Sequence, residues 1–426
     1  MNYFPSPRVF MLGTAWLAAC GAPASETEAG DASYGLEYRV TASPADHSVA
    51  VELRVSQDDD LLREMRFDAH PERYSGFEAD GKLSVSDGRV TWSPPDSGGS
   101  LRWQAKVPNR RNSGGHDAWL DESWGLFRAE DIIPRAATRT LIGVTSETSI
   151  TFSLPDTWSA VTEYIETDGQ FRVRNEERRF AQPSGWIVMG NLGVRRERIA
   201  GTRVAIAAPE NQGTRRMDML ALLNWTMPEL ARIVPIMPRR LTVVSAAEPM
   251  WRGALSAPQS IFIHADRPLI SENGTSTLLH EVVHVALAAN AARDFDWIVE
   301  GLAEYYSLQL LHRSGSITAS RFDKALQQLS NWAKSADSLC AESSSGAATA
   351  LAVTILAALD QEIRKVTNDE KSLDDVLRLM LQTSAPLNLE SLTNAAIDVL
   401  GQNPDTLHIN NLPGCRSIPT SSKAAK

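Results

Sequence analysis

The first half of the chain alternates apolar and polar residues with the period of two that is typical of β-strands. Residues 49–55, 101–107 and 150–154 each follow this alternation, and segments rich in Pro, Gly and Ser separate them. One face of such a strand packs on a core while the other meets water. We therefore predict an antiparallel β-sandwich-like domain over residues 34–208. We expect its tryptophans to pack in the core or at its edges rather than to form a ligand platform, among them Trp92, Trp103, Trp124 and Trp158.

After about residue 210 the apolar residues recur every three or four positions, which indicates helices. We predict helices at 217–233, 276–289 and 297–312, with Thr275 as the N-cap of the second, and three or four more within 319–402. Strands are predicted at 241–245 and at 259–264, the latter as an edge strand. The fold class is therefore α+β, with a mainly helical domain over residues 209–426.

The composition limits the classes of molecule that the protein could bind. The formal net charge of −10 and the pI of about 5.4 argue against nucleic acid, and the basic pairs are scattered along the chain. A hydrophobic content of 43% is ordinary for a globular protein.

The N-terminus has the features of an export signal. Residues 1–19 contain a short apolar run that ends in Leu17-Ala18-Ala19-Cys20-Gly21, which resembles a bacterial lipobox cleaved before a lipidated Cys20. An ordinary signal peptide with an incidental Cys is the alternative. Residues 20–33 are small, polar and acidic, as in a flexible tether. We expect a lipid anchor in the bacterial cell envelope, and Gly21, rather than Asp, favours the outer membrane with the protein facing the periplasm.

Two further cysteines, Cys340 and Cys415, would enter an oxidising compartment. Such a pair often forms a disulfide, although two buried thiols are the alternative.

The most informative motif is His280-Glu281-Val282-Val283-His284, within the predicted helix 276–289. Residues four apart share one helix face, so both imidazoles can bind one cation. Glu281 projects about 100° around the axis from His280, beside the metal rather than on it. A carboxylate there can take a proton from a water that the metal activates. A chance match is the alternative, but two His and a Glu in so apolar a helix would be costly without a metal.

The segment Trp297-Ile298-Val299-Glu300-Gly301-Leu302-Ala303-Glu304-Tyr305-Tyr306 follows. Together the two segments resemble the gluzincin branch of the thermolysin-like zinc peptidases, and in particular the aminopeptidase-N-like enzymes and the glycyl aminopeptidase family. The resemblance is strongest over about residues 200–312. It implies that residues 209–426 form a thermolysin-like zinc-peptidase domain behind the N-terminal β domain, with Zn²⁺ as cofactor.

The resemblance also assigns the remaining ligand. In the family signature the Glu before Gly binds the metal, so Glu300 joins His280 and His284 in a His₂Glu site with an open fourth position, as in catalytic zinc sites. Glu304, one turn later, is the rival ligand. An acidic residue at that offset in thermolysin-like sites accepts a hydrogen bond from the first zinc His, so we predict that Glu304 orients His280 and raises its basicity.

Two positions depart from the family pattern. Residues 253–257 stand where aminopeptidase-N-like enzymes carry Gly-x-Met-Glu-Asn, and Ser256 replaces the Glu that anchors the free amino terminus of the substrate. The family also uses a downstream Tyr or His to stabilise the oxyanion, but the chain has no Tyr after Tyr306. The candidates for that role are Tyr305, Tyr306, His264 and His312.

These features predict a zinc-dependent peptidase of the cell envelope that hydrolyses peptide or protein substrates, with Glu281 as the general base. A zinc amidase acting on cell-wall peptides is one alternative. A non-catalytic binding or scaffold lipoprotein with a zincin fold is the other, but a scaffold has no use for the base.

Overall fold

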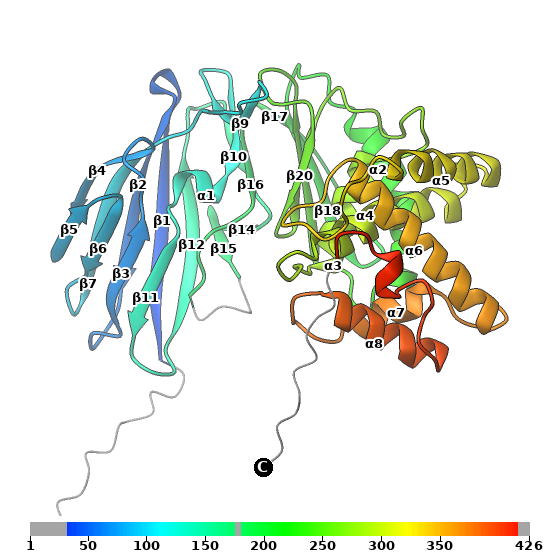
Figure 1. Cartoon of the computed structure of the whole chain (residues 1–426). Coiled ribbons are helices and arrows are strands. Elements are labelled where there is room, and N and C mark those ends of the chain that lie inside the picture. The colour runs from blue at the N-terminus through cyan, green and yellow to red at the C-terminus, as the bar shows by residue number, and fades with distance from the viewer. Residues whose placement is uncertain (1–31, 175–179, 416–426) are drawn as a thin grey trace, which may run out of the picture.

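The computed structural model describes residues 32–174 and 180–415 (Figure 1). The signal peptide, the lipidation site predicted at Cys20 and nearly all of the predicted tether lie outside the described residues. Among the residues that are described, no helix has the length and apolarity needed to cross a membrane.

Two sheets form the N-terminal sandwich, and their side chains share one core (Figure 1). In spatial order the larger sheet contains β14 (Ile165–Thr167), β15 (Gln170–Val173), β12 (Thr145–Ser153), β1 (Ser33–Ser43), β2 (Ser48–Ser56), β7 (Gly98–Lys106) and β4 (Tyr74–Ala79). The smaller sheet contains β11 (Ala136–Thr140), β3 (Leu62–Asp68), β6 (Arg89–Ser93) and β5 (Lys82–Ser86). Alternate residues of β1 and β2 are buried, as the period of two predicts. The predicted antiparallel sandwich is confirmed, with the parallel pairing of β1 and β12 as an exception.

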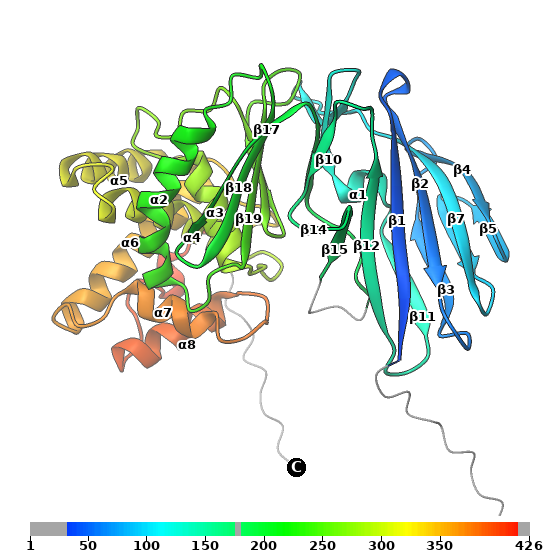
Figure 2. The same ribbon diagram turned by 180° about the vertical axis from the view of Figure 1, so that it is seen from behind.

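A third sheet lies between this sandwich and the rest of the molecule (Figures 1 and 2). It contains β13 (Ser159–Val161), β16 (Trp186–Gly190), β10 (Trp124–Arg128), β9 (His116–Leu120) and β8 (Asn109–Arg110), and α1 (Ala129–Ile132) follows β10. Neighbouring residues of β16 face opposite layers: Ile187 packs in the sandwich core, whereas Trp186 packs against the next sheet. Both faces of the strand are covered, which explains why β16 is apolar and buried throughout.

The fourth sheet belongs to the C-terminal half. Its spatial order is β17 (Leu192–Ile199), β18 (Thr202–Pro209), β19 (Arg240–Ala246), β21 (Ser260–His264) and β20 (Ala254–Ala257). β17 and β18 precede residue 209, and they belong to this sheet because β18 pairs in parallel with β19 and antiparallel with β17.

The edge of this sheet also differs from the prediction. The segment 259–264 is predicted as the edge strand, but β21 pairs with β19 on one side and with β20 on the other. That prediction is wrong. The order of strands in a sheet depends on contacts between segments that are distant in the sequence, and the local pattern does not contain them. The edge strand is β20.

Helices cover the far side of the fourth sheet and share a large apolar core with it (Figure 2). They are α2 (Arg216–Ile233), α3 (Thr277–Leu287), α4 (Asp296–Arg313), α5 (Ala319–Ala333), α6 (Ala347–Val366), α7 (Leu373–Met380) and α8 (Leu389–Leu400), with short 3₁₀ turns η1 (Pro44–Asp46) and η2 (Ile409–Asn411) elsewhere. The N-cap of α3 is Ser276, whose hydroxyl accepts the N–H of Leu279, and not the predicted Thr275, whose hydroxyl contacts that of Ser271. These helices confirm the mainly helical second half.

Candidate metal centre and its surroundings

Helices α3 and α4 bring together three side chains that could hold a metal ion. His280 and His284 lie one turn apart on α3, and their Nε2 atoms are 3.0 Å from each other. Glu300 on α4 faces both rings, with its carboxylate oxygens 3.4 Å from Nε2 of His280 and 3.3 Å from Nε2 of His284. Within the described parts of the chain, this is the cluster of His, Cys, Asp or Glu whose ligand atoms converge closely enough for one metal ion.

The donor set fits zinc. Two imidazole nitrogens and a carboxylate oxygen are ordinary zinc ligands at about 2.0–2.2 Å, and at such bond lengths the corners of a tetrahedron are about 3.3 Å apart. The measured separations of 3.0, 3.3 and 3.4 Å lie near that edge length. His280, His284 and Glu300 are therefore the residues that would hold the metal.

Gly301 allows α4, the helix that carries Glu300, to pack closely against α6. A Cβ at this position would lie 2.7 Å from Cβ of Ala352 on α6, so any larger residue would push α4 away from α6. The close packing of these two helices fixes the backbone that carries Glu300. In the Glu300-Gly301 pair, the first residue supplies the carboxylate, and the second leaves the space for α6 that positions it.

The outer nitrogen of His280 has its own partner. Nδ1 of His280 lies 2.9 Å from Oε2 of Glu304, one turn after Glu300 on α4. Burial alone would lower the pKa of His280, but hydrogen bonds with Glu300 and Glu304 outweigh burial and raise this pKa to about 10. Burial alone would raise the pKa of Glu300, but hydrogen bonds from both imidazoles lower it to about 2. The site therefore favours positive charge between its carboxylates.

Glu281 lies beside this cluster and is held by the edge strand. Its side chain is buried, and its Oε2 atom accepts a hydrogen bond of 2.8 Å from the backbone N–H of Ser256 on β20. Sequence reasoning considered only the side chain of Ser256, and it missed the role of its backbone. The contact depends on β20 being the edge strand, which the sequence pattern did not reveal.

A second contact at β20 was also missed. Trp186, on the third sheet, donates its indole N–H to the carbonyl of Leu255 at 2.9 Å. The two residues are 69 positions apart, so no local pattern could have paired them.

The four residues considered as oxyanion donors have contacts or positions outside the metal cluster. The hydroxyl of Tyr305 donates to Asp360 at 3.0 Å and that of Tyr306 donates to Asp374 at 3.2 Å, and both rings are buried. His312 lies three turns beyond Glu300, about 18 Å along the helix, and stacks on Phe322. His264 is fully buried at the end of β21. The structure therefore assigns the oxyanion role to none of them.

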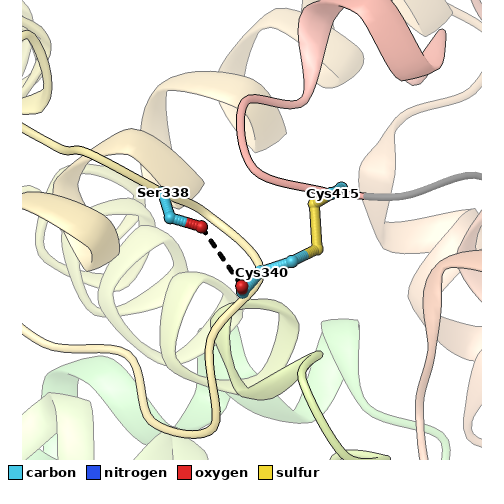
Figure 3. Close-up of a disulfide and its surroundings, with 3 residues drawn as sticks. All are labelled: Ser338, Cys340 and Cys415. Atoms are coloured by element: carbon cyan, nitrogen blue, oxygen red, sulfur yellow. Dashed lines mark hydrogen bonds between the residues drawn. A yellow bond between two sulfur atoms is a disulfide. The ribbon is translucent and has the colours of Figure 1, made fainter.

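Cys340 and Cys415 form a disulfide in the structure (Figure 3). It joins the loop between α5 and α6 to the last described residue, across 75 positions of sequence. The same loop contacts α4, because the N–H of Ser344 donates to Asp296 at the start of that helix. The disulfide thus restrains a loop that contacts the first residue of α4, the helix that carries Glu300.

Comparison with known proteins agrees with this geometry at the level of the fold. No protein-family model matches the sequence, and no curated protein matches it. Among solved structures, an aminopeptidase N family protein from Idiomarina loihiensis superposes with a TM-score of 0.64 and 16% identity, over 89% of this chain and 74% of that one. Yeast LTA4 hydrolase superposes with a TM-score of 0.52 and 13% identity, over 90% of this chain and 68% of that one. The chain therefore shares its fold with an aminopeptidase N family protein and with LTA4 hydrolase, which agrees with the fold that its motifs predict.

Proposed function

We propose that this protein is a zinc-dependent peptidase of the bacterial cell envelope. The observation that carries the proposal is the convergence of His280, His284 and Glu300 with a buried carboxylate, Glu281, held beside them. A binding protein that only needed the metal would have no use for an additional buried carboxylate beside the three ligands.

The chain supplies the proton transfers. A zinc ion held by the three ligands would act as a Lewis acid that activates a water and polarises the scissile carbonyl. Glu281 would take the proton of the attacking water and pass it to the leaving amine. Glu304 would hold the ring of His280 in the orientation that presents Nε2 to the metal.

The edge strand would align the substrate. β20 has β21 on one side, and no described strand pairs with its other side. An extended peptide can pair with such an edge through its main chain, which leaves its side chains free to determine specificity. Ser256 offers no carboxylate for a free amino terminus, which favours chains bound by their backbone.

Anchoring in the envelope rests on the sequence before residue 32. The disulfide between Cys340 and Cys415 supports export, because such bonds persist in oxidising compartments such as the bacterial periplasm. Substrates would therefore be peptides, proteins or cell-wall peptides within reach of a lipid-anchored enzyme.

The test is zinc content and hydrolysis by the purified mature protein. We expect about one zinc per chain and cleavage of a quenched peptide library, and loss of at least about 100-fold in rate for Glu281→Gln with zinc and fold retained. Purified cell-wall peptides in a parallel assay distinguish an amidase. Zinc binding with no cleavage of either substrate by the wild type would favour the scaffold alternative.

A further inference from the structure

The peptide group between Leu255 and Ser256 is hydrogen-bonded at both ends. Its carbonyl oxygen accepts the indole N–H of Trp186 at 2.9 Å, and its N–H donates to Oε2 of Glu281 at 2.8 Å. Trp186 belongs to β16 of the third sheet, and Glu281 belongs to α3. One peptide group thus joins the N-terminal half of the molecule to the carboxylate proposed as the base.

Trp186 is itself held firmly. Its side chain is fully buried, and its backbone N–H donates to Oγ of Ser260 at 2.9 Å. Its ring centre lies 5.3 Å from that of Phe262, and the guanidinium carbon of Arg128 lies over the Trp186 ring, 5.6 Å from its centre. Ser260 and Phe262 are on β21, the partner of β20, so Trp186 contacts both strands of this hairpin.

We propose that Trp186 is a positioning residue for Glu281, acting through the Leu255–Ser256 peptide group. This inference rests on the proposed function. Hydrogen bonds in a chain polarise one another, so a carbonyl that accepts from the indole makes the N–H of the same peptide group a better donor. That N–H holds Oε2 of Glu281 and leaves its other oxygen for the proton of the attacking water. The N-terminal half would then contribute to catalysis without touching the substrate.

The kinetic test is Trp186→Phe, which keeps an aromatic ring and removes the indole donor. Loss of one buried hydrogen bond that acts through the peptide group should lower kcat about 2–10-fold, with KM and zinc content unchanged. The matched control is Trp103→Phe. Trp103 is also buried and donates its indole N–H to a backbone carbonyl, that of Ile132, at 2.9 Å, but within the sandwich. It should lose similar stability and keep its kcat.

A second readout does not need activity. Labelling leucine carbonyls with ¹³C and serine amides with ¹⁵N selects the Leu-Ser pairs, which occur in this sequence at Leu83–Ser84, Leu255–Ser256 and Leu329–Ser330. We expect the Ser256 amide signal to move in Trp186→Phe and in Glu281→Gln, while the Ser84 and Ser330 signals stay in place. Glu281→Gln leaves Trp186 intact, so its Ser256 amide signal tests the hydrogen bond between Ser256 and Glu281 even if Trp186→Phe does not fold.

The outcomes separate this inference from the proposed function. A wild type that cleaves peptides, with Trp186→Phe no slower than Trp103→Phe, overturns the role of Trp186 alone. A Ser256 amide that does not respond to either substitution also overturns it. A wild type that cleaves nothing contradicts the proposed function, and the amide signals then still report whether Trp186 and Glu281 share the peptide group.

Discussion

Nδ1 of His280 lies 2.9 Å from Oε2 of Glu304, whereas Nε2 of the same ring faces Glu300. The two glutamates are one turn apart on α4 and contact opposite nitrogens of one imidazole. Only the Nε2 side also faces His284. This arrangement is the one expected if Glu300 is a metal ligand and Glu304 orients the ring of His280.

Alanine substitutions should therefore have different effects at the two positions. Glu300→Ala removes a donor from a three-ligand set and should lose most of its zinc on dialysis. Glu304→Ala keeps all three donors, so it should bind zinc from excess metal while losing about 10–100-fold in affinity or activity. Zinc stoichiometry after dialysis and after reloading measures both effects. The assignment is wrong if Glu304→Ala is the metal-free variant and Glu300→Ala stays loaded.

A buried carboxyl at the joint between the third and fourth sheets predicts a pH-dependent stability. Burial raises the pKa of Glu163 to about 8, although Arg240, 3.9 Å away, opposes this shift. An unfolded chain loses this proton near pH 4.5. Between these values the unfolded state binds fewer protons than the folded state, so the contribution of Glu163 to the free energy of unfolding falls as pH rises, by at most about 1.4 kcal/mol per pH unit.

Glu163→Gln should remove that slope. The free energy of unfolding of the variant minus that of the wild type should therefore increase from pH 5 to pH 8. Urea denaturation at several pH values measures this change. Glu166→Gln is the matched control, because Glu166 is exposed in the same segment and its loss should leave the slope as in the wild type. Parallel profiles for the wild type and Glu163→Gln would contradict the burial of a proton at this site.

Removal of the disulfide should destabilise the C-terminal half. A bridge across 75 residues restricts the unfolded chain, and such bridges typically contribute about 2–4 kcal/mol. The double variant Cys340→Ser and Cys415→Ser should therefore unfold at lower denaturant concentration than the oxidised wild type, and reduction of the wild type should have the same effect. Two free thiols in the protein isolated under non-reducing conditions would contradict the bridge.

The lipid anchor remains a prediction from the sequence around Cys20. Cys20→Ala should leave a protein that is not lipidated and that no longer partitions with membranes. Fractionation of expressing cells, with mass measurement of the N-terminal peptide, tests this expectation. Unchanged membrane association of the variant would refute the lipobox interpretation.

The parts of the site that sequence could predict are those determined by helical spacing. His280, Glu281 and His284 follow from one turn of helix, and the signature around Glu300 and Glu304 lies on the next helix, so short segments contain most of the information. The alternation of apolar residues likewise predicted the sandwich, because burial of one face acts on each strand separately.

Contacts between segments that are distant in the sequence could not be predicted from the sequence pattern. Whether β20 or β21 forms the edge depends on which strand pairs with β19, and nothing within residues 254–264 determines that pairing. The same holds for β18, whose parallel pairing with β19 joins β17 and β18 to the fourth sheet. The hydroxyls of Tyr305 and Tyr306 are engaged by aspartates more than 50 positions away, so their availability could not be judged from their own helix.

The apolar layer between the third and fourth sheets limits how the molecule can be divided. It contains side chains from both halves, among them Trp186, Val188, Val244 and Phe262, and all of these are buried. A fragment that began at Leu192 would expose Val244 and Phe262 to water as part of a continuous hydrophobic wall, which is a typical cause of aggregation. Neither half is therefore autonomous, and truncation or domain exchange at this point should yield insoluble material rather than a smaller enzyme.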